Sequence, residues 1–229
     1  INLVTDLESL EVEETILAGK PVEDITWPEN SSSHLTDTVR LEKEITPETF
    51  DIPESASQYG VKVRDQDIIT KKTEVPDPKR PSLDRCAVIE RHKGTGNIGR
   101  SFIEGFNLET GAIASTVAHD SHNLIVLGEN EEDMSISVKY LMDVGGGQVV
   151  TENGEVKAAV ELPVAGLMSD LPPGEVSTSL KELEEAVSEI GCELSRPFMI
   201  LSSLALAVIP EVRLTDKGLV DVNTQEIIH

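Results

Sequence analysis

The alternation of short apolar runs with amphipathic segments in the second half of the chain is the feature that most constrains the fold. Residues 86–90, 112–118 and 124–128 are apolar runs of strand length, bounded by charged or turn-forming residues. Runs of this kind predict buried β-strands. Residues 101–107 predict a short helix. Because aromatic residues make up only 3% of the chain, we expect a core built mainly from Leu, Ile, Val and Ala.

Two further segments have helical periodicity. Residues 131–144 and 175–190 place apolar side chains three or four positions apart, which predicts helices with one buried face. The first opens with acidic residues, which favour a helix N-terminus, and both are followed by glycine. Residues 198–208 are a third apolar stretch, either helical or simply buried, which ends before Pro210. The apolar positions of the two periodic faces are Met134, Val138, Leu141, Met142, Val176, Leu180, Leu183, Val187 and Ile190.

Hairpin signals indicate that strands pair with their neighbours in sequence. Residues 148–162 alternate around Asn153-Gly154, a pair that accepts positive φ in a type I′ turn. Shorter strand signals lie at residues 61–64 and 68–70, and two more lie near the C-terminus. Together these patterns predict an α+β fold of mixed, largely antiparallel sheets with packed helices.

The N-terminal third has a different pattern. Residues 2–22 predict a hairpin with one apolar face, which is too small to bury that face alone and is expected to pair with a sheet elsewhere. Residues 23–57 are rich in Ser, Thr, Pro and acidic residues, which predicts a long connection. We therefore divide the chain into residues 1–26, a linker-rich region with short strands over 27–80, and an α+β domain over 81–229.

Composition excludes several classes of protein. The 42 acidic and 19 basic residues give a net charge of −23, which repels nucleic-acid backbones and anionic membranes. No apolar run approaches the 18 or so residues of a membrane span, and no signal peptide opens the chain. The two cysteines have no CxxC spacing, which argues against a disulfide scaffold and a thiolate zinc site. We expect a cytoplasmic protein that binds neither nucleic acid nor membrane.

A glycine-rich loop follows the first apolar run. Gly94, Gly96 and Gly99 have the G-x-G-x-x-G spacing of a dinucleotide-binding loop, but the pattern after them is antiparallel and the expected helix is short, which disfavours that function. A tight loop that brings its backbone close to a ligand or another domain is the favoured interpretation. Arg91 and His92 at its mouth could orient an anionic or polar group.

A polar motif separates two apolar runs. Residues 118–123 read Ala-His-Asp-Ser-His-Asn, and two histidines at i and i+3 could form half of a metal site. The remaining histidines do not obviously converge on them, and turn chemistry is the unspecialised alternative. Five polar groups between two buried strands favour a functional loop. Its residues are His119, Asp120, Ser121, His122 and Asn123.

Several blocks together resemble the C-terminal part of bacterial and archaeal adenine deaminases, members of the amidohydrolase superfamily. The blocks occur in order over about residues 85 to 222, and they are RHKGTGNIGRSFIEGF, GAIASTVAHDSHNLIVLG, GGGQVV, LPVAGLMSD and PFMILSSLALAVIPEVRLTDKGLVDV. The opening residues resemble the segment that returns from the catalytic barrel to a small β-domain. The resemblance implies hydrolysis of adenine to hypoxanthine and ammonia by a metal-activated hydroxide, with Mn²⁺ or Fe²⁺ held by the barrel.

The resemblance also implies a division of labour. No H-x-H motif and no series of eight βα units occurs here, so the chain, which begins at Ile1, resembles a C-terminal piece that lacks the catalytic barrel. We expect no metal ligands and no catalytic residue in it, and an inactive isolated fragment. The loop of residues 119–123 is expected to close over adenine, with Arg91, His92 and the three glycines as a second segment of the same cleft. The expected partners are the parent chain's barrel and a second copy in a homodimer.

Two other interpretations remain. The domain could be a non-catalytic binding or assembly module that inherited the fold, and an upstream H-x-H barrel in the reading frame would argue against this. A stand-alone metalloenzyme using His119 and His122 is disfavoured, because a complete centre needs more ligands than these two residues supply.

Overall fold

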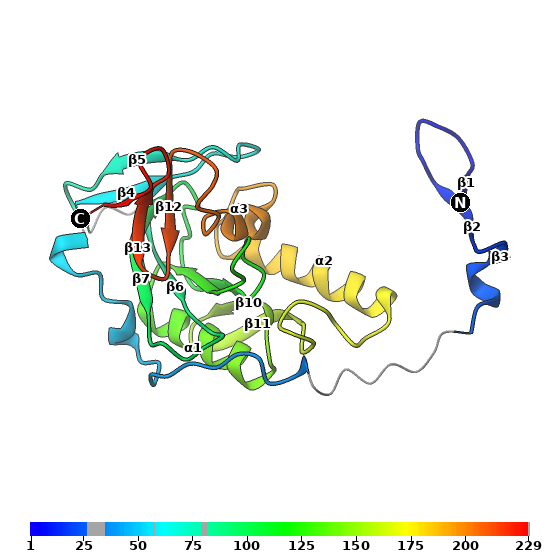
Figure 1. The fold of residues 1–229 in the computed structure, drawn as a ribbon, viewed down its shortest axis with the longest axis horizontal. Coiled ribbons are helices and arrows are strands. Elements are labelled where there is room, and N and C mark those ends of the chain that lie inside the picture. The colour runs from blue at the N-terminus through cyan, green and yellow to red at the C-terminus, as the bar shows by residue number, and fades with distance from the viewer. Residues whose placement is uncertain (27–34, 57, 79–81, 229) are drawn as a thin grey trace. The chain divides into compact units, whose positions relative to one another are not determined.

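The computed structural model divides the chain into two compact units, residues 1–34 and 35–229 (Figure 1). The residues that the structure describes are 1–26, 35–56, 58–78 and 82–228.

The first unit is a small antiparallel sheet, so the predicted hairpin is confirmed. Its strands are β1 (Asn2–Val4), β2 (Val12–Leu17) and β3 (Lys20–Pro21), followed by the single 3₁₀ turn η1 (Val22–Asp24). Ala18 and Gly19 form the β2–β3 turn, both with positive φ. Leu3, Val12 and Leu17 stay 44–50% exposed, because residues 1–26 form no second layer over this three-stranded sheet.

The second unit is built on an eight-stranded sheet with the order β11-β10-β8-β9-β6-β7-β4-β5. Every neighbouring pair is antiparallel except β4 and β7, which are parallel. The predicted α+β class with largely antiparallel sheets is therefore confirmed. The strands are β4 (Tyr59–Lys62), β5 (Lys71–Glu74), β6 (Leu83–Ile89), β7 (Ile98–Glu104), β8 (Ala112–Ser115), β9 (Leu124–Gly128), β10 (Gly147–Glu152) and β11 (Glu155–Glu161).

Helices cover both faces of this sheet, which explains why its central strands are continuous apolar runs (Figure 1). On β6, Cys86 and Val88 pack with α2 (Pro173–Glu189), α3 (Pro197–Ser203) and the C-terminal strands. Ala87 and Ile89 pack on the other face with α1 (Glu131–Asp143) and the turn η3 (Pro47–Phe50). The alternation follows from the two-residue period of a strand, which sends successive side chains to opposite faces. The unit is thus a three-layer arrangement with a large apolar core on each face of the sheet.

The α-helices in the described part of the chain are α1 (Glu131–Asp143), α2 (Pro173–Glu189) and α3 (Pro197–Ser203). The first two match the predicted segments closely. Asn130 caps α1, because its side chain accepts the N–H of Asp133 at 2.8 Å. The predicted hairpin over 148–162 is confirmed by β10 and β11, whose turn places Asn153 and Gly154 at φ of 54° and 84°. Among the described residues no helix is both long and apolar enough to cross a bilayer.

The third helix is shorter than the apolar stretch that predicted it. It ends at Ser203, and the buried guanidinium of Arg213 binds the carbonyl oxygens of Ser203 and Ile209 at 3.0 and 2.8 Å. Further N–H groups of Arg213 donate to the carbonyl oxygens of Ile68 and Pro210. One side chain thus donates hydrogen bonds to four carbonyl oxygens. These bonds stabilise a loop that folds back on itself rather than a further turn of helix.

Two predicted elements are wrong. Residues 101–107 are not a helix, since Ile98–Glu104 is strand β7, which makes seven pairs with β6 and also pairs with β4. Residues 68–70 are not a strand but the loop before β5, in which Thr70 bonds across to the main chain of Pro210 and Val212. In both cases long-range pairing decides a conformation that the local pattern leaves open.

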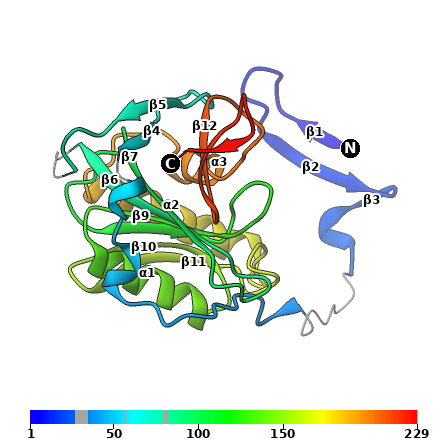
Figure 2. The ribbon, with the colours of Figure 1, turned by 60° about the vertical axis from the view of Figure 1, so that its left-hand side comes forward.

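The chain ends in a small antiparallel sheet that packs on the same side as α3 (Figure 2). Its strands are β12 (Val212–Thr215), β13 (Gly218–Asp221) and β14 (Glu226–Ile227). A Cβ on Gly99 of β7 would lie 1.8 Å from the carbonyl oxygen of Thr215. The sheet can therefore approach β7 this closely only because residue 99 is glycine.

Candidate functional site

The polar motif forms the connection between the buried strands β8 and β9, as the sequence indicated. Its first turn is closed by its own groups: the N–H of His122 donates to the carbonyl of Ala118 at 2.6 Å, and the N–H of Ala118 donates to Nδ1 of His122 at 3.3 Å. The N–H of His119 donates to the carbonyl of Ser202 on α3 at 3.1 Å. The loop is thus closed by its own hydrogen bonds and anchored to α3.

The polar side chains of the loop become less exposed along the chain. His119, Asp120 and Ser121 are exposed, His122 is half-buried, and Asn123 is buried with 5% of its surface exposed. The backbone N–H of Asn123 donates to Ser121 Oγ at 3.4 Å, but within the described part of the chain its side-chain amide has no hydrogen-bond partner. A buried amide without a partner costs about 1–3 kcal/mol, so this group is suited to bind a ligand or water.

The second predicted segment lies against the first. Arg91 Nε donates to the carbonyl of His122 at 2.6 Å, and His92 Nε2 lies 2.7 Å from the carbonyl of Ser121. Two segments 27 or more residues apart in sequence therefore meet through side-chain to main-chain hydrogen bonds. The donors are charged or aromatic N–H groups, and the acceptors are loop carbonyls.

The Arg91 guanidinium is engaged by protein atoms on every side. Besides His122, it donates to the carbonyl and hydroxyl of Thr38 at 3.1 and 3.2 Å and to the carbonyl of Ala165 at 3.0 Å. Its side chain is 1% exposed, and burial lowers its pKa to about 10. Gly166 has positive φ and packs against the guanidinium, where a Cβ would lie 2.9 Å from two of its nitrogens. Arg91 therefore joins three loops rather than offering its charge to a ligand.

Glu90 organises the glycine-rich loop next to Arg91. Its carboxylate accepts the N–H groups of His92, Lys93 and Thr95 at 2.6–2.9 Å and the Thr95 hydroxyl at 3.0 Å. Desolvation alone would raise the pKa of Glu90, but these hydrogen bonds outweigh it and hold that pKa at about 2. The backbone N–H groups of this loop are consequently turned inward, onto the protein's own carboxylate.

The three glycines of that loop do not form a dinucleotide site. Gly94 and Gly96 have positive φ of 61° and 71° and lie near Glu42 and Lys43, whereas Gly99 belongs to β7. A strand, not a helix, follows the loop, so no helix N-terminus is available for a pyrophosphate. The sequence-based preference for a tight loop over a nucleotide-binding one agrees with this geometry.

The charge state of the loop is set by its surroundings. The pKa of His122 is lowered, mainly because burial disfavours its charged form, and also because His119 and Arg91 lie near. The rings of His119 and His122 are 6.0 Å apart in an edge-on arrangement. Since Nδ1 of His122 accepts a hydrogen bond, the neutral imidazole carries its proton on Nε2, which is then a donor.

The described residues contain no cluster of three or more His, Cys, Asp or Glu side chains that could hold a metal ion. His34 and His229, two of the remaining histidines that the sequence did not place near this motif, lie outside the described residues. The residue set around His119 and His122 therefore does not fit a metal centre. The thiols of Cys86 and Cys192 are free and buried, and burial raises the pKa of both.

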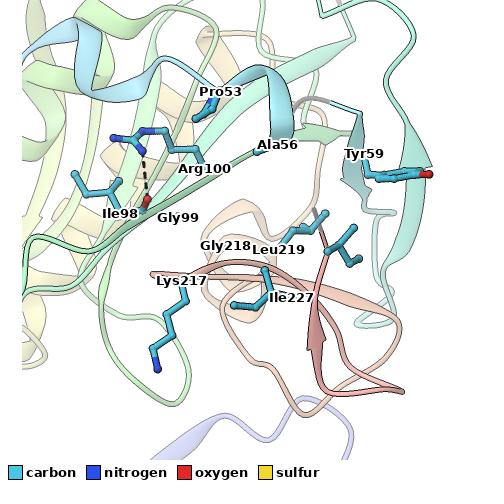
Figure 3. Close-up of a pocket in the computed structure, with 11 residues that line it drawn as sticks. Pro53, Ala56, Tyr59, Ile98, Gly99, Arg100, Lys217, Gly218, Leu219 and Ile227 are labelled. Carbon is cyan, nitrogen blue, oxygen red and sulfur yellow. Dashed lines mark hydrogen bonds between the residues drawn. The ribbon is translucent and has the colours of Figure 1, made fainter.

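A separate, mostly apolar pocket of about 200 Å³ is lined by Pro53, Ala56 and Tyr59, by residues of β7 and by the C-terminal sheet (Figure 3). Only Gly99 of the predicted site residues lines it. Arg100 also lines it, but two of its N–H groups already donate to the carbonyls of Thr49 and Ile98. The pocket is thus distinct from the loop of residues 119–123.

Sequence reasoning missed the groups that hold the site together. Thr38 and Ala165 accept from Arg91, and Thr116 links two loops by donating to the carbonyl of Gly166 at 2.6 Å while accepting the N–H of Gly147 at 2.8 Å. None of them forms a recognisable motif. The one available signal was Gly166 within an apolar block, which marks a position where another group approaches the backbone.

These features define a class of protein, an α+β domain whose polar loop is supported by a buried arginine. Its described residues contain neither a barrel nor a cluster of metal ligands. Residues 58–226 match the family model described as the adenine deaminase C-terminal domain. The chain belongs to this family.

Named relatives agree with this assignment. An adenine deaminase of Oleidesulfovibrio alaskensis is 39% identical over 99% of this chain and 41% of its own length. One of Desulfatibacillum aliphaticivorans is 49% identical over 69% of this chain and 28% of its own, and one of Dehalococcoides mccartyi is 51% identical over 64% and 26%. The chain thus spans about two fifths or less of the length of these relatives.

Proposed function

We propose that this chain is the substrate-closing part of an adenine deaminase, which converts adenine and water into hypoxanthine and ammonia. The observation that carries the proposal is the match over nearly the whole chain to proteins named adenine deaminase. Because the described residues do not fit a metal centre, we assign the Mn²⁺ or Fe²⁺ and the catalytic barrel to the part of the relatives that lies outside the match. We assign residues 1–26 to a small β-domain that adjoins this barrel.

The loop of residues 119–123 is the proposed contact to the base. Neutral His122 offers an N–H donor at Nε2, and Asn123 offers a buried amide with both donor and acceptor atoms. A purine edge alternates acceptors and donors, so such groups can bind it in one orientation. The anchoring of the loop by Arg91 and Ser202 supports preorganisation, which limits the entropy lost on binding.

Cellular role follows from the same proposal. The enzyme would act in purine salvage in the cytoplasm, in keeping with the acidic composition and the few cysteines. A homodimer is part of the proposal.

The test uses a long chain, in which this protein is joined to the segment that the O. alaskensis relative carries outside the match. We expect adenine-dependent ammonia release from the long chain with Mn²⁺ or Fe²⁺ and none from the 229 residues alone. His122→Ala in the long chain should lower kcat/KM for adenine about tenfold or more, the equivalent of one lost hydrogen bond to a buried group.

Two comparisons make this test specific. His122→Gln, whose amide nitrogen can replace Nε2 as a donor, should recover part of the lost activity, and Glu155→Ala on the exposed start of β11 should leave it unchanged. Full activity of His122→Ala would remove the loop from the substrate site. Activity of the 229 residues alone would overturn the division of labour.

A further inference from the structure

Two hollows on the surface of the second unit meet at α3. One, of about 450 Å³, lies between the loop of residues 66–68 and the start of α3, and the other, of about 240 Å³, lies between α2 and α3. Both are lined by Arg196 and Met199. We call this continuous region the α3 surface and define it by Ile68, Leu180, Arg196, Phe198 and Met199.

The α3 surface exposes several large apolar side chains. Met199 is 57% exposed and Ile68 is 58% exposed, while Leu180 is 40% exposed although its helical periodicity groups it with the buried Leu183. Covering a side chain of this size contributes about 1.5–3 kcal/mol. Adjacent exposed apolar residues on an otherwise strongly acidic chain indicate an interaction surface.

One cation stands in the middle of this surface. Arg196 lines both hollows, is exposed, and has no ion pair within the described part of the chain. Asp67 and Glu184 line the same two hollows but form no ion pair with Arg196 in the described part of the chain. An unpaired arginine where the two hollows meet is therefore suited to a carboxylate supplied by a partner, since Arg binds carboxylates through two parallel hydrogen bonds.

The α3 surface and the proposed substrate loop are connected through helix α3. Met199 and Ser202 are three residues apart on this helix, with Met199 exposed and Ser202 buried. The carbonyl of Ser202 is the acceptor that holds the N–H of His119. A partner seated on Met199 would consequently lie about one helical turn from the residue that holds the loop of residues 119–123.

We propose that the α3 surface is the seat of the remaining part of the adenine deaminase polypeptide, in which an apolar patch covers Met199 and Ile68 and a carboxylate pairs with Arg196. The O. alaskensis relative matches this chain over only 41% of its length, so more than half of it is available as the occupant. This inference rests on the proposed function, because it takes the partner of the substrate loop to be that same polypeptide.

Hydrogen–deuterium exchange of the long chain and the 229-residue chain tests the proposal. The amides of Phe198 and Met199 are in the first turn of α3 and have no acceptor within the helix, so they exchange rapidly unless a partner covers them. We expect peptides over residues 66–69 and 197–200 to exchange at least about tenfold more slowly in the long chain. Equal rates in the two chains would overturn the proposal.

Variants separate the surface from the fold. Met199→Asp should abolish the added protection, whereas Val156→Asp, at a residue 37% exposed on β11, should preserve it. In the 229-residue chain neither change should shift Tm by more than a few degrees, because both side chains are exposed. Retained protection in the Met199→Asp long chain would contradict the assignment.

The two proposals fail in different ways. Protection without ammonia release would refute the proposed function and keep the interface, while ammonia release without protection would refute the interface alone. Protection that grows with concentration in the 229-residue chain would identify a second copy as the occupant and overturn the choice of partner.

Discussion

Arg91 Nε lies 2.6 Å from the carbonyl oxygen of His122. With this bond one buried guanidinium joins the loop of residues 119–123 to the segment of Thr38 and, through Ala165, to the loop that precedes α2. The polar loop is therefore held from beneath by a fixed cation, and its exposed side chains are left to face outward.

The first prediction concerns this support. Arg91→Lys should lower the free energy of unfolding by about 2–4 kcal/mol, because an ammonium cannot reach three separately placed groups and leaves buried carbonyls without donors. Urea denaturation of the 229-residue chain measures it. Arg40→Lys is the matched control, since Arg40 is 66% exposed and lies 3.7 Å from Asp37; its cost should stay below about 1 kcal/mol. Equal costs for the two variants would contradict the role given to Arg91.

The sequence could predict what is decided locally. Asn153-Gly154 fixes a hairpin through its own φ preferences, and the periodicity of Met134, Val138 and Leu141 identifies α1 without reference to any partner. The helix predicted over residues 101–107 was wrong because their apolar positions suit a strand or a short helix equally well. Pairing with β6 and β4 decides in favour of the strand.

The same distinction applies to the candidate site, whose segments could be predicted from the sequence while the contact between them could not. The polar loop and the Arg91-His92 segment were recognisable because ionisable residues interrupt apolar runs. Their contact was not, because Arg91 reaches partners 31, 53 and 74 residues away along the chain. The sequence suggested that Arg91 could orient an anionic or polar group. In the structure its guanidinium donates hydrogen bonds to the carbonyl groups of His122, Thr38 and Ala165.

Glu90 should stabilise the fold at neutral pH and not in acid. Its pKa is lowered from 4.5 to about 2 in the folded protein, so its contribution is fully present above about pH 4.5 and is lost as the pH falls through about 2. Glu90→Gln should cost about 1–3 kcal/mol at neutral pH, because charged acceptors bind N–H groups more strongly than amides do. Urea denaturation at neutral and acid pH measures the difference, which should shrink in acid. Glu155→Gln serves as the exposed control, and a cost for Glu90→Gln that did not depend on pH would contradict this account.

Asp84 should have the opposite effect on the pH dependence of stability, because it stabilises the fold in acid and not at neutral pH. It is 1% exposed, and burial raises its pKa to about 7 although it accepts the N–H groups of Asn107 and Leu108. The folded state therefore binds a proton that the unfolded state releases near pH 3.8, and the stabilisation is lost as the pH rises from there through about 7. Asp84→Asn should remove a slope of up to about 1.4 kcal/mol per pH unit. Denaturation across that range measures the slope, and an unchanged slope in the variant would show that Asp84 ionises normally.

Two glycines should respond in opposite ways to alanine. Gly99→Ala would place Cβ against the carbonyl of Thr215 and the N–H of Gly218, so the C-terminal sheet must move and stability should fall by about 3 kcal/mol or more. Gly174, in the first turn of α2, has no atom within 4 Å of the position that a Cβ would take, and Gly174→Ala should stabilise by about 0.5–1 kcal/mol. Thermal unfolding compares the two. A tolerated Gly99→Ala would mean that β12 and β13 do not pack on β7 as described.

The last prediction concerns the charge of the loop of residues 119–123. Because burial is the largest cause of the lowered pKa of His122, with His119 second, His119→Gln should raise that pKa yet leave it below 6.5. NMR titration of the His122 ring protons in the 229-residue chain measures this. His92→Gln is the comparison, since His92 makes the smallest contribution of the nearby charges and its loss should move the pKa less. An unfolded-like pKa of 6.5 in His119→Gln would mean that repulsion, not burial, keeps His122 neutral.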